Sequence, residues 1–211
     1  MNNYSKCLVV GSSGVGKSSF INAITKSKEC KVSSEAYNCT MDLQLIYTEH
    51  DNNKYIFVDT PGFDPPCGDG LNIQSLKSIS NYPKIKCIIF VMSFYDIRVT
   101  NSMVQNIKKL IEWFPIKQFW EHVFIVRTRS PRRRRGGFDE EIENIEGSFV
   151  KSLNYSDDLK KLITEKKIAN IPSFIDEFYV DCPGEENDYE ENKEEFYKIF
   201  KKIKNIGTFL N

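Results

Sequence analysis

The segment from Gly11 to Ser18 reads Gly-Ser-Ser-Gly-Val-Gly-Lys-Ser and matches the complete pattern of a phosphate-binding loop. In such a loop, backbone N–H groups surround the phosphates of a nucleotide, and glycines let the main chain approach them. We expect Lys17 to reach the β- and γ-phosphates and the Ser18 hydroxyl to bind Mg²⁺. The residues predicted to contact the nucleotide here are Ser13, Gly14, Val15, Gly16, Lys17, Ser18 and Ser19.

The segments on either side of this loop have the character that it requires. Cys7–Val10 is a short apolar run that suits a buried parallel strand. Ser19–Ile24 begins a helical pattern, and the amino end of a helix attracts phosphate. Both flanks favour a phosphate-binding loop over an ordinary turn between a strand and a helix.

A second motif, Asp59-Thr60-Pro61-Gly62, follows the apolar strand pattern of residues 54–58. An Asp at the end of such a strand can hold Mg²⁺ through a water, and the Gly62 N–H can bond the γ-phosphate. Its distance from the loop, about forty residues, is typical of GTPases, whereas ATPases usually place this Asp differently. A GTPase that binds GTP or GDP with Mg²⁺ is therefore predicted, with an ATP-binding protein as the alternative.

The loop between the first helix and the next strand, residues 27–40, should supply a further Mg²⁺ and γ-phosphate ligand. Thr40 is the candidate because it stands just before the strand, and Ser33 and Ser34 are the alternatives. The predicted metal ligands are Ser18, Thr40 and Asp59, and the predicted catalytic residues are Lys17, Thr40 and Gly62.

The order of apolar patterns predicts an α/β fold in a single domain over residues 1–211. The predicted strands are residues 4–10, 42–48, 55–59, 85–92, 123–126 and 177–181. A hairpin turn at 49–53 makes the second and third antiparallel, while helical crossovers make the others parallel. The predicted helices follow the phosphate-binding loop, lie near 72–80, and span the apolar stripes at 103–114, 142–153 and 196–203. The expected architecture is the P-loop GTPase (Ras-like) fold, a mostly parallel six-stranded sheet with one antiparallel edge strand and helices on both faces.

Composition excludes several classes of protein. Lys and Arg number 29, as do Asp and Glu, and this neutral balance gives no reason to expect a nucleic-acid partner. The six cysteines form no Cys-x-x-Cys pair, which indicates reduced thiols and a cytoplasmic location. No apolar run approaches the roughly 18 residues of a membrane-spanning helix. Attachment at a membrane surface stays open.

Thr128 and Arg129 stand where most GTPases carry Asn-Lys-x-Asp, whose Asp selects guanine. This Thr-Arg pair resembles the motif of the GIMAP proteins and their plant avirulence-induced relatives, which are septin-like GTPases. The resemblance covers nearly the whole chain and extends to three further stretches, Asp59–Phe63, Arg98–Thr100 and Phe119–His122. It implies a GTP- and GDP-binding domain that dimerises through its nucleotide face with a second copy or a related GTPase, often at a membrane.

One departure from the family pattern concerns the base. The acidic residue should fall near Pro131, which has no carboxylate. Arg129 could still stack its aliphatic stem on the base. Asp181 is the candidate for a replacement acid, with Glu185 and Glu186 as alternatives from the same loop.

Two more features bear on partners and turnover. The run Arg132–Arg135 could contact an anion (an acidic protein, a membrane surface or nucleic acid), form a solvated loop, or lend an arginine to a dimer partner. Phe63 occupies the place where many small GTPases have a water-positioning Gln. We therefore expect either a GTPase of low intrinsic rate or a nucleotide-gated scaffold with negligible turnover.

Overall fold

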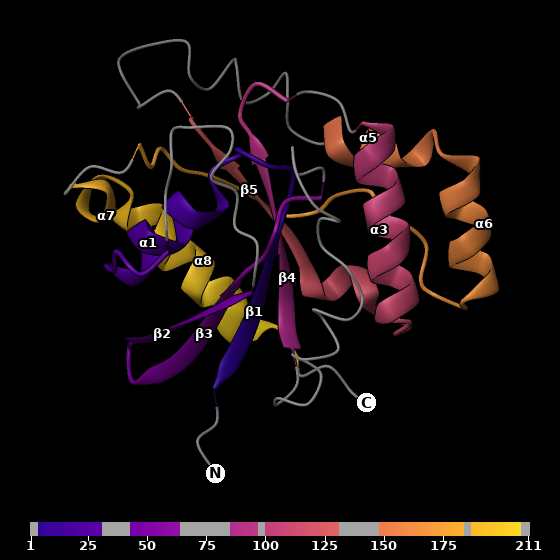
Figure 1. Cartoon of the computed structure of the whole chain (residues 1–211). Coiled ribbons are helices and arrows are strands. Elements are labelled where there is room, and N and C mark those ends of the chain that lie inside the picture. Colours follow the sequence, from indigo (N-terminus) through magenta and orange to yellow (C-terminus); the bar gives the residue numbers. More distant parts are fainter. Residues whose placement is uncertain are drawn as a thin grey trace.

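The computed structural model describes residues 4–30, 43–63, 85–96, 100–130, 148–183 and 187–207. In these ranges a six-stranded sheet has the order β2-β3-β1-β4-β5-β6, with helices on both faces (Figure 1). The strands are β1 Ser5–Val10, β2 Gln44–His50, β3 Asn53–Asp59, β4 Ile85–Ser93, β5 Val123–Thr128 and β6 Glu177–Tyr179. Among them, β2 and β3 pair antiparallel and the other neighbours pair in parallel. The predicted fold is confirmed.

The hairpin between β2 and β3 is tighter than expected. The prediction of a turn at 49–53 was wrong in length, because β2 continues to His50 and β3 starts at Asn53. The two turn residues, Asp51 and Asn52, have φ values of 48° and 59°. Asp and Asn tolerate this left-handed conformation, and a two-residue turn of this kind matches the twist of the flanking strands.

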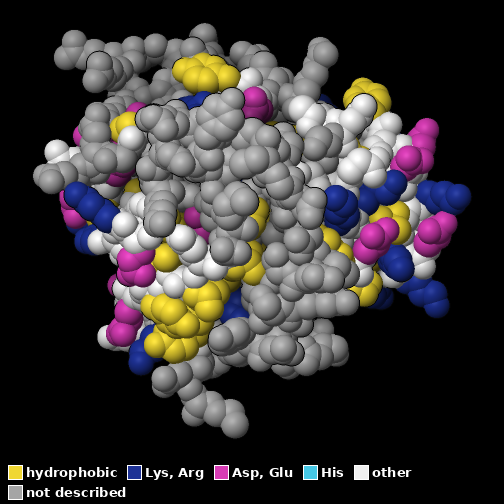
Figure 2. Space-filling model, viewed as in Figure 1, with side chains coloured by type: hydrophobic (Ala, Val, Ile, Leu, Met, Phe, Trp, Pro, Cys, Tyr) yellow, Lys and Arg dark blue, Asp and Glu magenta, His cyan; other side chains and the backbone are white. Residues whose placement is uncertain are grey.

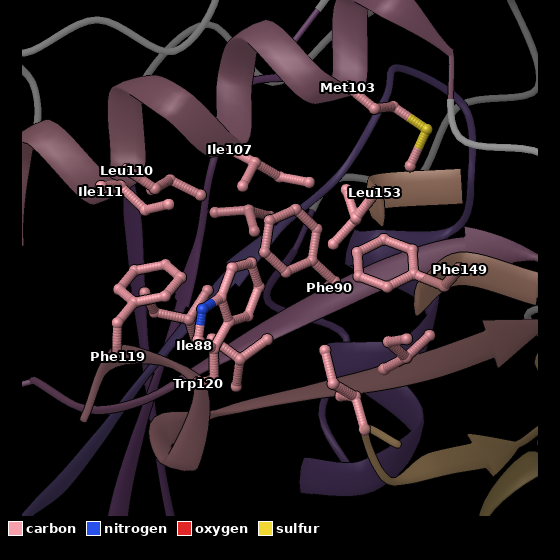
Figure 3. Packing of buried hydrophobic residues seen from close by; sticks show 14 of the residues in the cluster. Ile88, Phe90, Met103, Ile107, Leu110, Ile111, Phe119, Trp120, Phe149 and Leu153 are labelled. Atoms are coloured by element: carbon pink, nitrogen blue, oxygen red, sulfur yellow. The ribbon is translucent and has the colours of Figure 1, made fainter. Parts of the chain in front are cut away.

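Alternating side chains along the strands feed two apolar layers. In β1, Cys7 and Val9 pack with the helices α1 Lys17–Thr25 and α8 Lys193–Asn205. Leu8 and Val10 point to the opposite face, which is covered by α3 Asn101–Trp113, α5 Ser148–Asn154 and α6 Asp157–Glu165. Figure 3 shows this second layer, in which side chains of β4 meet those of α3 and α5: Ile88, Phe90, Ile107, Leu110, Ile111, Phe149 and Leu153.

The helix predictions had mixed outcomes. The one ending before Pro115 is confirmed as α3, which Thr100 caps by accepting a hydrogen bond from the Met103 N–H. The first and last predicted helices are confirmed as α1 and α8. The stripe at 142–153 is confirmed from residue 148 onwards as α5, whereas its first part and the helix near 72–80 lie outside the described residues.

Three short elements were not predicted: the 3-10 helix η1 Phe119–His122 and the helices α6 and α7 Asp188–Glu191. For α6 the sequence held a signal, since Ser156 caps it by accepting from the Leu159 N–H. Its outer side carries charged side chains of both signs (Figure 2). In the part of the chain described here, no helix has the length and apolar character of a membrane span.

Candidate nucleotide-binding site

The phosphate-binding loop connects the carboxyl end of β1 to the amino end of α1, as predicted. Gly14 and Gly16 have φ values of 74° and 95°, a conformation that glycine adopts without strain. Gly16 is also the residue that caps α1. The loop therefore places its main chain and the amino end of a nine-residue helix together, an arrangement that favours an anion.

Lys17 lies within the curve of this loop. Its side chain is buried, with 6% of the residue exposed. Its ammonium donates hydrogen bonds to the carbonyl oxygens of Gly11 at 3.1 Å and Ser12 at 2.8 Å. These bonds hold a positive charge against the loop, where a phosphate oxygen could replace a carbonyl as acceptor.

Asp59 and Ser18 form the second part of the site. The Ser18 hydroxyl donates to Asp59 Oδ2 at 2.6 Å, and Asp59 is fully buried. Burial raises the pKa of the Asp59 carboxyl, while the Ser18 hydrogen bond and the Lys17 charge act in the opposite direction. Among the described residues, Asp59 Oδ1 accepts no hydrogen bond of ordinary geometry, while the Cys30 thiol and the Thr60 N–H lie close enough to act against the rise in the carboxyl pKa. An unpartnered carboxylate oxygen beside a hydroxyl fits Mg²⁺, which prefers oxygen ligands. Thr40, the third predicted ligand, lies outside the described residues.

The segment that follows Asp59 packs directly on the phosphate-binding loop. The Thr60 hydroxyl donates to the Val9 carbonyl at 2.8 Å, and the Phe63 N–H donates to the Gly11 carbonyl at 3.2 Å. A Cβ placed on Gly62 would lie 2.7 Å from the Ser13 nitrogen. Gly62 is thus brought against the loop, as its predicted role requires, and any side chain there would push the two segments apart.

The side chain of Phe63 takes part in the apolar core. Its ring centroid lies 6.1 Å from that of Phe90, in the layer that contains α3. An aromatic ring packed in this way cannot hold the water that attacks the γ-phosphate.

Thr128 and Arg129 both fasten the phosphate-binding loop. The buried Thr128 hydroxyl bonds the Val15 carbonyl and lies 3.2 Å from the Met92 carbonyl. Arg129 Nη2 donates to the Gly14 carbonyl at 2.7 Å, and its backbone has a φ of 55°. An arginine in this conformation is uncommon, and its hydrogen bond to the loop offsets the strain. The pair predicted to lie beside the base therefore also shapes the phosphate site.

Asp181 lies at the same end of the sheet. β6 ends at Tyr179, earlier than predicted, although the main chain of Val180 stays bonded to the end of β5, donating to the Arg127 carbonyl at 2.8 Å and accepting from the Ser130 N–H at 3.2 Å. The side chain of Asn192 clamps the main chain of Asp181, accepting from its N–H at 2.9 Å and donating to its carbonyl at 2.7 Å. Asp181 is thus positioned near β5, while Pro131, Glu185 and Glu186 lie outside the described residues.

Sequence reasoning missed three residues that support the site. Asn192 clamps Asp181 as described, and Asn22 holds the main chain of Cys30 in the same way, at 2.8 and 2.9 Å. The third is Arg127, fully buried in β5 directly before Thr128. Arg127 did give a signal, since a charge next to the apolar run of residues 123–126 demands a buried partner.

Comparison with known proteins supports this description. A family model described as 50S ribosome-binding GTPase matches residues 6–127. GTPase Era of Mycoplasmopsis agalactiae is 34% identical over 86 residues, which are 39% of this chain and 28% of that protein. GTPase Era of Clostridium botulinum is 45% identical over 86 residues, 40% of this chain and 28% of that protein. The chain thus matches 28% of the length of these curated relatives.

Solved structures resemble the chain over nearly its whole length. Toc33 from Arabidopsis thaliana, in complex with Mg²⁺ and GMPPNP, has a TM-score of 0.66 at 18% identity and covers 100% of this chain and 89% of its own. Era, in complex with MgGDPNP and nucleotides 1506–1542 of 16S ribosomal RNA, has a TM-score of 0.61 at 15% identity, covering 98% and 58%. At such identities the likeness shows the fold alone. Together with the family model over residues 6–127, it supports a P-loop GTPase and does not single out the GIMAP proteins.

Proposed function

We propose that this chain, which belongs to the 50S ribosome-binding GTPase family, binds GTP and GDP with Mg²⁺ and hydrolyses GTP slowly. One observation carries the proposal. Lys17, Ser18 and Asp59 lie together at one end of the sheet, and Thr128 and Arg129 fasten the loop that precedes Lys17 to the end of β5. This arrangement supplies the positive charge, the oxygen ligands and the positioned main chain that a nucleotide triphosphate needs.

Each of these residues has a distinct task in the proposed reaction. The Lys17 ammonium would exchange its carbonyl acceptors for oxygens of the β- and γ-phosphates. Ser18, Asp59 and Thr40 would hold Mg²⁺, which supplies charge neutralisation at the phosphates when bound. The Gly62 N–H would bond the γ-phosphate, so that loss of this phosphate loosens the segment after Asp59.

The proposed intrinsic rate is low, at or below about 10⁻⁴–10⁻³ s⁻¹. Phe63 supports this, because its ring packs on Phe90 where a water-positioning side chain would be needed. We expect acceleration from a second copy that covers the nucleotide face, excludes water and supplies a cation. The family resemblance motivates this dimer, and dimerisation is described as important for the GTPase activity of the structurally similar Toc33. Arg98 and Arg132–Arg135, the candidate donors, lie outside the described residues.

Turnover measured against protein concentration tests the proposal. Activity per molecule should rise with concentration, and a non-hydrolysable GTP analogue should shift the sedimentation coefficient toward a dimer. Fast turnover that stays constant on dilution would contradict it, because one chain would then hold a complete catalytic centre.

Phe63 also favours the second candidate, a nucleotide-gated scaffold, for which the analogue should drive dimerisation without turnover at any concentration.

We further propose that the chain acts in the cytoplasm, either free or at a membrane surface reached through Arg132–Arg135. Cys7, Cys30 and Cys87 support a reducing compartment, since all three are buried free thiols. Co-sedimentation with anionic vesicles tests the membrane contact, and loss of binding on replacing the four arginines with Ala is expected. The neutral net charge supports a chain without a nucleic-acid partner, and an electrophoretic shift with RNA would contradict that.

A further inference from the structure

A buried charge pair lies directly beneath the residues that fasten the nucleotide loop. The side chain of Arg127 is 0% exposed and that of Glu177 is 1% exposed. Arg127 Nε donates to Glu177 Oε2 at 2.7 Å, which joins β5 to the edge strand β6. Removing two charges from water is costly, so a pair of this kind persists where its geometry is well satisfied.

The rest of the Arg127 guanidinium binds two further parts of the chain. Nη1 donates to the Asp96 carbonyl at 2.7 Å, on the segment that leaves β4. Nη2 donates to the Ser148 hydroxyl at 3.2 Å, at the first residue of α5. The planar fork of one arginine therefore holds β6, the end of β4 and the start of α5 in a fixed relation to β5.

Because side chains alternate along a strand, Arg127 and Thr128 point to opposite faces of the sheet. Arg127 follows Ile125 on the face covered by α3 and α5, while Thr128 points toward the Val15 carbonyl. The Thr128 carbonyl in turn accepts from the Phe94 N–H at 2.8 Å. The end of β5 is thus fixed by Arg127 on one face and by the phosphate-binding loop on the other.

We propose that Arg127, paired with Glu177, is a positioning residue for nucleotide-base selectivity in this chain. The pair sets the place of Thr128 and Arg129 without touching the nucleotide, so distorting it shifts the residues beside the base. A displacement of about 1 Å in a positioned contact can lower a reaction rate by up to about a hundredfold. A displaced base contact should likewise weaken binding of the base that it recognises, whereas a general loss of stability affects every nucleotide alike. This inference rests on the proposed function, since it requires a guanine nucleotide in the site.

The test compares GDP with ADP, which share ribose and phosphates and differ in the base. Dissociation constants would be measured by calorimetry, well below the melting temperature, for the wild-type chain and for Arg127→Lys, which keeps the charge and loses the planar fork. We expect the preference for GDP to fall about tenfold in Arg127→Lys. Ser148→Ala removes one contact of the fork and should lower the preference by about threefold; it should also lower stability, because a buried guanidinium N–H loses this acceptor.

Leu110→Ala is the matched control, because it creates a cavity in the same apolar layer, on α3. It should lower the melting temperature and leave the GDP preference unchanged. An Arg127→Lys chain that melts earlier but keeps its preference would overturn the inference, because the pair would then be merely structural. Should Arg127→Lys fail to fold, an unchanged preference in Ser148→Ala would overturn it instead. Equal binding of GDP and ADP by the wild-type chain would refute the guanine assignment itself, a result distinct from both.

Discussion

Replacing Gly62 with Ala tests how closely the segment after Asp59 must approach the phosphate-binding loop. The new methyl group would lie 2.7, 2.8 and 2.9 Å from the nitrogen, Cα and Cβ of Ser13. Ordinary contacts are about 3.4 Å or longer, so the segments must separate by at least about 0.7 Å. The hydrogen bond from Phe63 to Gly11, now 3.2 Å long, would then exceed the usual limit. Overpacking of this kind costs about 1–3 kcal/mol.

For a chain of this size, that loss corresponds to a decrease of about 2–12 °C in melting temperature. The ratio of GTP-analogue affinity to GDP affinity is a more specific measurement than the melting temperature. The Gly62 N–H should bond the γ-phosphate, and GDP lacks this group. We expect the ratio of GTP-analogue affinity to GDP affinity to fall about tenfold or more, a loss of one charge-assisted hydrogen bond. Gly207→Ala is the control, because a Cβ there has open space. If Gly62→Ala retained both the melting temperature and the affinity ratio, the close packing described for this segment would be refuted.

Substitutions at three further positions probe the site. Lys17→Ala should weaken GDP binding by at least about tenfold through the loss of charge-assisted hydrogen bonds, and unchanged affinity in calorimetry would rule out its phosphate contact. Burial raises the pKa of Asp59, so the nucleotide-free protein should lose stability as the pH rises above 3.8 toward the raised value. Asp59→Asn should flatten this part of a plot of melting temperature against pH and abolish Mg²⁺-dependent nucleotide binding. Thr128→Val should leave the buried Val15 carbonyl without its partner, lowering stability by about 1–3 kcal/mol and weakening GDP binding, whereas Thr128→Ser should behave like the wild type in both assays.

The parts of the site that the sequence predicted are those encoded by contiguous residues. The phosphate-binding loop and Asp59-Thr60-Pro61-Gly62 have chemical patterns that imply their own surroundings, namely a buried strand before each motif and a helix after the loop. The structure places both as expected, with Ser18 bonded to Asp59. The six strands and their parallel or antiparallel directions followed in the same way from apolar runs and crossover rules.

The parts that the sequence missed depend on partners distant along the chain. Glu177 lies fifty residues from Arg127, and nothing in either neighbourhood identifies the other. Asn192 supports Asp181 through backbone groups, which every residue carries, so no residue type marks the clamp. Thr128 was singled out as a candidate base contact, but its bond to the Val15 carbonyl was not predictable for the same reason.

The central claim is that this chain holds a guanine nucleotide with Mg²⁺ at the loop containing Lys17. Competition calorimetry with GDP and ADP, in Mg²⁺ and after its chelation, tests the claim most directly. We predict that GDP binds about tenfold to a hundredfold more tightly than ADP in Mg²⁺, and that chelation weakens GDP binding strongly. Equal affinities for the two nucleotides, or GDP binding indifferent to Mg²⁺, would contradict the account.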